Sequence, residues 1–169
     1  MAPRADAVAI VTGGSCEIGR SVARTLARRG YAIVVVYLED QSRAEATVEE
    51  ILAADGIAVA VRADVTDDLD VERLFNETIA AFGGVDAVVH TTMRSASVLY
   101  QHAARQLHRG SAIVSVSTAE QITPALAQQL HERDITVIGF PPGLEAAGAD
   151  HGVADLISSL DRWRHRRAR

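Results

Sequence analysis

The chain has 169 residues, 48% of them apolar and 23% charged, which is enough for one sizeable hydrophobic core and excludes wholesale disorder. Its seventeen basic residues are all arginines, which excludes a lysine Schiff base and a tyrosine–lysine catalytic pair, and its one cysteine excludes an intramolecular disulfide. Five arginines lie in the last eight residues, so residues 1–161 carry a formal net charge of −10, which argues against general nucleic-acid binding.

Short β-branched runs alternate with amphipathic segments along the chain. Six runs are nearly all apolar, as expected of parallel strands covered on both faces, and predict strands at Ala7–Thr12, Ala32–Leu38, Ile57–Arg62, Ala87–Thr91, Ala112–Ser117 and Thr136–Phe140. Helical periodicity predicts helices at Ile18–Arg29, Gln41–Ala54, Leu69–Phe82, Val98–Leu107, Pro124–Glu132 and Val153–Trp163. This alternation predicts an α/β fold: a Rossmann-type, doubly wound parallel sheet of about six strands with helices on both faces.

A glycine-rich loop joins the first predicted strand to the first predicted helix, from Thr12 to Gly19. Glycines allow a tight turn and a close approach of the backbone, and the free N–H groups and the helix dipole then face an anion. Doubly wound sheets bind ligands beyond the carboxyl ends of their strands, where this loop lies. The loop therefore predicts a phosphate site, and we expect a single nucleotide-binding domain over residues 1–161 with a basic tail over 162–169.

The string from Ala9 to Ser15, continued at Ile18-Gly19-Arg20, resembles the short-chain dehydrogenase/reductase family, particularly its ketoacyl-reductase-like members. The resemblance continues in order at residues 34–37, 63–67, 82–86, 112–117, 126–130, 135–137 and 142–143. It implies the family's NAD(P)-dependent carbonyl or alcohol oxidoreductase chemistry. It also implies cofactor contacts at Thr12, Gly13, Ser15, Ile18, Gly19, Tyr37, Arg43, Asp64, Val65, Pro142 and Gly143.

The choice of nucleotide depends on the residues after the second strand. Tyr37 ends that strand as in NADP-preferring members of the family, and Arg43 is the nearest possible phosphate partner. Glu39 and Asp40 would oppose a 2′-phosphate unless they point away. The resemblance favours NADP over NAD, with absent binding as a third possibility. Asp64 and Val65 match the pair of residues that the family uses to hold adenine. The alternative role of Asp64 is to cap the turn.

Two departures from the family pattern affect the nucleotide site. Glu17 stands where the family has the central glycine of its loop, and a carboxylate there would face a bound pyrophosphate. The string from His90 to Met93 replaces the family's Asn-Asn-Ala-Gly, so the glycine that lets the cofactor approach is absent.

Further departures affect catalysis. Relative to the family the chain is internally shortened, and the region of its Tyr-x-x-x-Lys pair holds no tyrosine and no lysine. Thr118 matches the family's catalytic serine and keeps its hydroxyl, but without the tyrosine and lysine partners. His90 can be an acid near neutral pH or a structural hydrogen-bonding residue. The sequence thus favours a non-catalytic family member that binds NADP(H) and serves as a partner or regulatory subunit. The alternatives are an oxidoreductase rebuilt around His90 or Thr118, and a chain that merely folds.

The sequence also gives expectations about location, metal binding and partners. The apolar runs are too short to cross a membrane, and the first lies beside Arg4 and Asp6 without the length of a signal peptide, so we expect a cytoplasmic protein. The histidines have no spacing that converges on a metal. The predicted helices Val98–Leu107 and Pro124–Glu132 have apolar faces that need covering. This predicts a homodimer, or a pairing with another chain, through Val98, Leu99, Leu126 and Leu130.

Overall fold

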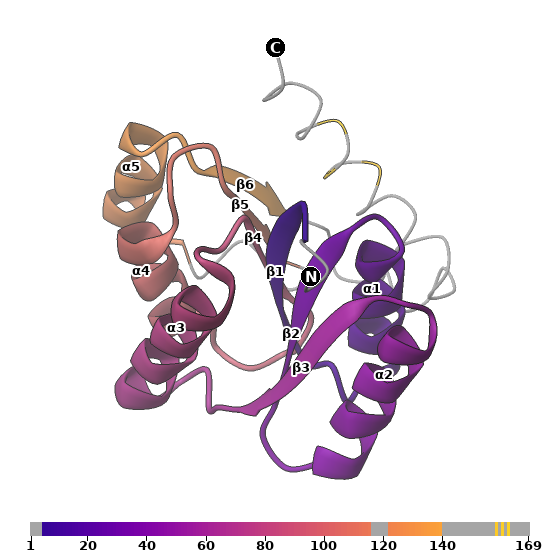
Figure 1. Ribbon diagram of the computed structural model, residues 1–169. Helices are drawn as coiled ribbons and strands as arrows, with labels where there is room; N and C mark the ends of the chain where they lie inside the picture. The colour runs from indigo at the N-terminus through magenta and orange to yellow at the C-terminus, as the bar shows by residue number, and fades with distance from the viewer. Residues whose placement is uncertain (1–4, 116–121, 140–157, 159, 161, 163–169) are drawn as a thin grey trace.

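A computed structural model of the chain describes residues 5–115, 122–139, 158, 160 and 162 (Figure 1). Strands and helices alternate along it. The strands are β1 (Ala7–Thr12), β2 (Tyr31–Tyr37), β3 (Ile57–Arg62), β4 (Ala87–His90), β5 (Ala112–Ser115) and β6 (Thr136–Gly139). The helices are α1 (Glu17–Ala27), α2 (Gln41–Ala53), α3 (Asp68–Phe82), α4 (Ser97–Gln106) and α5 (Pro124–Glu132).

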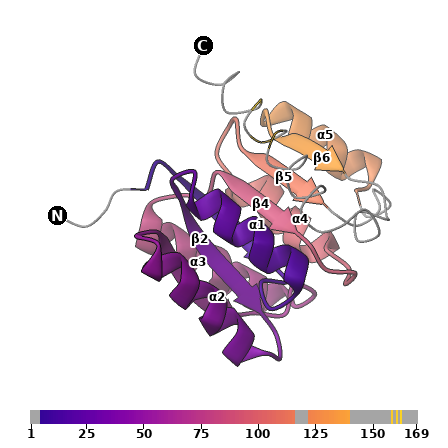
Figure 2. The same cartoon turned by 90° about the vertical axis from the view of Figure 1, so that its right-hand side faces the viewer.

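The strands form one parallel sheet in the order β3-β2-β1-β4-β5-β6. Helices α1 and α2 cover one face, and α3, α4 and α5 cover the other (Figures 1 and 2). The order reverses between β1 and β4, so the carboxyl ends of these two strands make the topological switch point, where such sheets bind ligands. This confirms the predicted doubly wound α/β fold.

The predicted bounds differ from the structure by a residue or two at several ends. Strand β4 ends at His90, and the hydroxyl of the next residue, Thr91, donates to the Thr12 carbonyl (2.7 Å). Helix α1 ends at Ala27 because the chain turns back at Gly30, whose φ of +87° is left-handed. The predicted ends at Ser117 and Phe140, and all of Val153–Trp163 but three positions, lie outside the described residues.

Two hydrophobic cores lie on the two faces of the sheet, because successive strand residues point to opposite sides. Ala9 and Val11 of β1 pack with α1 and α2, and Leu160 joins this core. Ile10, from the same strand, packs with the helices of the other face. Every residue of β1 is buried, as the continuous apolar run predicts for a central parallel strand.

The apolar faces of α4 and α5 are covered by the chain itself. Leu99, Leu126 and Leu130 are buried in the second core, and Val98 packs against it half-buried. The expectation that these side chains need an external cover was wrong, because α4 and α5 turn them toward the sheet. Dimerisation stays a prediction, but uncovered apolar faces on α4 and α5 no longer support it. No helix in the described parts of the chain is long and apolar enough to cross a membrane.

Candidate functional site

The turn between β1 and α1 leaves no room for side chains at its glycines. Gly13 has a left-handed φ of +73°. A Cβ atom at Gly19 would lie 2.1 Å from the Gly13 carbonyl oxygen, and one at Gly14 would lie 2.2 Å from a Val35 methyl group. Helix α1 therefore begins directly against the turn, and its amino end points to the switch point.

The first turn of α1 has no side-chain cap within the described structure. Cys16 is the N-cap residue, and its side chain makes no capping hydrogen bond within the described structure. The N–H groups of the first three helical residues have no partner inside a helix and are suited to an anion. Glu17 is the first residue of the helix and is exposed, so its carboxylate lies in solvent at the positive end of the dipole.

A cleft of about 230 Å³ opens at the carboxyl end of the sheet beside this turn. Five predicted contacts line it: Thr12, Gly13, Ser15, Tyr37 and Val65. The acids that follow β2, Glu39 and Asp40, also line it, as do Thr92 and Arg94 from the loop after β4. Arg94 was not predicted, because its only local signal in the sequence is its place directly after the His90–Met93 string.

Several other predicted contacts lie outside the lining of the cleft. Arg43 is largely exposed, and its Nε atom lies 3.3 Å from the carboxylate of Asp40, which also caps α2. Ile18 packs half-buried against the core on the α1 side. Thr118, Pro142 and Gly143 lie outside the described residues.

Asp64 uses both of its carboxylate oxygens within the protein. Its Oδ1 atom accepts bonds from the backbone N–H (2.9 Å) and the hydroxyl (2.7 Å) of Thr66. Its Oδ2 atom lies 3.4 Å from the Arg94 guanidinium. The bonds from Thr66, and then the charge of Arg94, hold the pKa of Asp64 below its ordinary value. These contacts favour the turn-capping interpretation of Asp64.

His90 is fully buried at the end of β4 and binds protein groups through both ring nitrogens. Its Nε2 atom lies 3.0 Å from the Arg94 carbonyl, which can only accept, so Nε2 carries the proton. Its Nδ1 atom then accepts from the Thr12 hydroxyl (2.7 Å). Burial lowers the pKa of His90, which keeps the ring neutral. The ring thus ties the loop after β4 to β1.

The threonines after His90 lie directly on the glycine turn. A Cβ atom at Gly13 would lie 2.6 Å from both the Thr91 hydroxyl oxygen and a Thr92 methyl group. Thr91 also lies 3.6 Å from the Cys16 sulfur. The replaced string therefore packs closely against the turn, and of its two threonines only Thr92 faces the cleft.

Comparison with known proteins gives a consistent set of matches. The family model for short chain dehydrogenases matches residues 7–106. A 3-oxoacyl-[acyl-carrier-protein] reductase of Staphylococcus aureus is 42% identical over 82 residues, which are 48% of this chain and 33% of the relative. The chain spans about a third of the length of the curated relatives it matches.

Solved structures match over more of the chain. A dehydrogenase/reductase from Sinorhizobium meliloti has a TM-score of 0.67 at 29% identity, covering 80% of this chain and 72% of that one. A short chain dehydrogenase from Burkholderia cenocepacia, solved in complex with NADP, has a TM-score of 0.72 at 24% identity, covering 91% and 90%. At 24% identity, the likeness to the Burkholderia cenocepacia structure shows the fold alone.

Proposed function

The chain belongs to the short chain dehydrogenase family, and from this membership we propose that it binds NADP(H) at the switch-point cleft without the family's usual hydride-transfer chemistry. The observation that carries the proposal is the open cleft between the glycine turn and the end of β2, beside the uncapped amino end of α1. We place the pyrophosphate at that helix end and the adenosine between Tyr37 and Val65.

The residues around this position supply the contacts such a ligand needs. First-turn N–H groups of α1 would meet the pyrophosphate, and the exposed carboxylate of Glu17 can turn away into solvent. The Burkholderia chain, solved with NADP, supports the choice of nucleotide at the level of the fold. Glu39 and Asp40 lie in the cleft and would repel a 2′-phosphate, which limits the affinity.

The chemistry of hydride transfer has little support in this chain. The sequence has no lysine to lower the pKa of a tyrosine, so the family's proton donor is missing. His90, the alternative acid, is neutral, fully buried and bonded at both nitrogens, which leaves no ring atom for a substrate. We therefore propose a nucleotide-dependent partner or regulatory subunit.

Calorimetric titration of the purified protein with NADPH, and then with NADH, tests the proposal. Gly13→Ala should abolish binding, because its Cβ atom would collide with Thr91 and Thr92. Gly83→Ala is the matched control: Gly83 has a similar left-handed φ of +86°, and nothing described lies within 4 Å of its added Cβ atom. Both variants carry the same backbone strain.

Absence of heat with both nucleotides would contradict the binding proposal. Turnover of carbonyl substrates by the wild type would contradict the non-catalytic part. Loss of that turnover in a Thr118→Ala or His90→Asn variant that stays folded would then establish the rebuilt oxidoreductase.

A further inference from the structure

Arg94 forms a wall of the cleft that no sequence pattern indicated. It comes from the loop after β4, while its partner Asp64 comes from the turn after β3. In the sheet β2 and β1 lie between these two strands, so the pair bridges two loops across the switch point. The Arg94 side chain is 48% exposed, and the residue lines the cleft.

Protein contacts restrict the position of Arg94 before a ligand arrives. Its carbonyl accepts the Nε2 proton of the buried His90 (3.0 Å), which ties the backbone of the loop to the sheet. Its Nη2 atom lies 3.4 Å from Asp64 Oδ2. Asp64 is itself fixed, because its N–H group donates to Asp70 (2.9 Å) and its Oδ1 atom accepts two bonds from Thr66.

The two carboxylate oxygens of Asp64 are used unequally. Oδ1 accepts both bonds from Thr66, and these cap the turn. Oδ2 makes one contact within the described residues, the 3.4 Å approach of Arg94, and a carboxylate oxygen can accept more than one bond. The bonds from Thr66, and then the charge of Arg94, hold the pKa of Asp64 low, so the group is ionised at neutral pH. Oδ2 is therefore able to accept from a ligand.

The guanidinium of Arg94 has donors to spare. A guanidinium has five N–H groups, and the contact with Asp64 uses one terminal nitrogen. Asp64 stands in the chain between Ala63 and Val65, and both of these line the cleft together with Arg94. The ion pair thus offers an acceptor beside donors at one wall of the cleft.

Adenine carries the complementary groups on one edge of its ring. Its N6 amino group donates and its N7 atom accepts, and the amide of an asparagine or a glutamine binds both positions with an oxygen and an N–H group. An aspartate in contact with an arginine offers the same combination from two side chains. The positive charge of the guanidinium makes its hydrogen bonds stronger than those of a neutral amide.

We propose that Arg94 donates a hydrogen bond to N7 of a bound adenine base while Asp64 Oδ2 accepts from the N6 amino group. The proposal rests on the proposed function, since it needs an adenine nucleotide whose base lies against Val65. The role of Asp64 follows from the family resemblance. The donor at Arg94 is the specificity-determining group that we add to it.

Calorimetric titration with ADP and with 7-deaza-ADP tests this contact. The two probes share the amino group, the ribose and the diphosphate, and they differ in that a C–H group replaces N7. The wild type should bind ADP about fivefold more tightly than 7-deaza-ADP, the range expected of one hydrogen bond at a partly exposed site.

Arg94→Met completes a cycle of two proteins and two ligands. The loss of a positive charge near the diphosphate lowers the affinity for both probes by the same factor, so the ratio of the two affinities isolates the contact with N7. This ratio should fall from about five to about one. If the variant does not fold, the wild-type comparison of the two probes still tests the contact.

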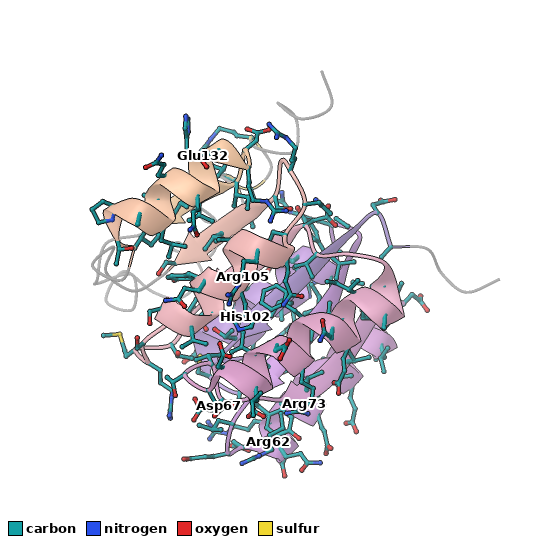
Figure 3. All side chains as sticks on the ribbon, turned by 90° about the vertical axis from the view of Figure 1, so that its left-hand side faces the viewer. Arg62, Asp67, Arg73, His102, Arg105 and Glu132 are labelled. Atoms are coloured by element: carbon teal, nitrogen blue, oxygen red, sulfur yellow. The ribbon has the colours of Figure 1, made fainter. Side chains whose placement is uncertain are left out.

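Arg105→Met is the matched control. It removes the same charge and the same kind of side chain from α4, the helix that follows Arg94 in the chain (Figure 3). Arg105 is exposed and lies outside the lining of the cleft. The ratio should stay at about five in this variant.

The outcomes distinguish the two proposals. Equal binding of ADP and 7-deaza-ADP by the wild type would overturn the contact with N7 and leave nucleotide binding in place. A fivefold ratio that survives in Arg94→Met would also overturn it, and so would binding of NADPH without binding of either ADP form. Absence of heat from the wild type with NADPH, NADH and both ADP forms would overturn both proposals.

Discussion

In the half of the sheet made by β1, β2 and β3, backbone packs directly on backbone and on apolar side chains. Gly19 abuts the Gly13 carbonyl, and Gly14 abuts Val35. In the half made by β4, β5 and β6, the loop after β4 and the end of α4 are positioned by polar side chains that bind main-chain carbonyl groups. His90 binds the Arg94 carbonyl, and Arg133 binds three carbonyls at the carboxyl end of α4.

Opposite kinds of substitution should therefore destabilise the two halves. A close-packed backbone is damaged when an atom is added, because its neighbours have no room to move. A polar anchor is damaged when atoms are removed, because the carbonyl it held stays buried without a partner. Nucleotide binding depends on both, since the cleft has the glycine turn on one side and the loop after β4 on the other.

The largest effect is expected for His90→Ala in the second half. The substitution leaves a cavity beside Tyr100 and removes the partners of the Thr12 hydroxyl and the Arg94 carbonyl. The free energy of unfolding, measured in urea, should fall by about 3 kcal/mol. The exposed His131→Ala is the control, with a change within about 0.5 kcal/mol. A loss below about 1 kcal/mol for His90→Ala would contradict the role of the ring as an anchor.

Gly19→Ala tests the first half by adding one methyl group. The new carbon would overlap the Gly13 carbonyl oxygen, so the start of α1 must shift. We expect a loss of about 2 kcal/mol in stability, together with a loss of nucleotide affinity. Gly139→Ala on β6 makes the same change where nothing described lies within 4 Å, and chemical denaturation should show no loss there.

Arg133→Met tests the second half at the end of α4. The guanidinium of Arg133 donates to the carbonyls of Ala104 (3.0 Å) and Leu107 (2.9 Å) and also to that of Arg105. Its removal should lower the midpoint of thermal unfolding and cost about 1.5 kcal/mol. Arg105→Met, on the exposed side of the same helix, should cost less than about 0.5 kcal/mol, and equal losses would contradict the capping role (Figure 3).

The pH dependence of the free energy of unfolding should show the burial of His90, in the second half of the sheet, directly in the wild-type protein. Burial lowers the pKa of His90 below its ordinary value of 6.5, so the unfolded chain takes up this proton first as the pH falls. His90 therefore leaves stability unaffected above about pH 6.5 and lowers it below that pH, by at most about 1.4 kcal/mol per pH unit. Urea titrations of His90→Asn across this range should lack that component. An unchanged profile would mean that His90 has the same pKa in the folded and the unfolded chain, and would contradict the effect of burial.

The smallest effect is expected at the acidic side of the cleft. Glu39→Gln removes a charge near the proposed 2′-phosphate, and affinity for NADPH should rise about threefold at low salt while affinity for NADH stays the same. Glu45→Gln is the control, because Glu45 is exposed on α2 and outside the lining. An equal gain for both nucleotides would place the phosphate away from Glu39.

Most of the fold was predictable, because its signals are local. Continuous apolar runs indicate buried parallel strands, and the bounds of β1, β3 and α5 agree with the prediction to the residue. The glycine turn was also predictable, since Gly13 and Gly19 are required by geometry that one strand and one helix create. Part of the cleft followed from its place after the strands, including Tyr37 and Val65.

The contacts that shape the rest of the cleft join residues distant in the chain. Arg94 and Asp64 are 30 residues apart, and Thr12 and His90 are 78 apart. Whether such pairs meet depends on the order of the strands and on the side to which each loop turns. Arg43, the cation nearest the cleft in sequence, is instead paired with Asp40 on the first turn of α2.

The amino-acid sequence by itself determined the elements, their order and the position of the glycine turn, because hydrophobic periodicity and glycine act over a few residues. Only the tertiary structure decided that His90 is buried, that Leu126 and Leu130 are covered by their own chain, and that Arg94 reaches Asp64. Burial and ion pairing depend on what lies opposite a side chain in space. That neighbour is supplied by the folded sheet and not by the adjoining sequence.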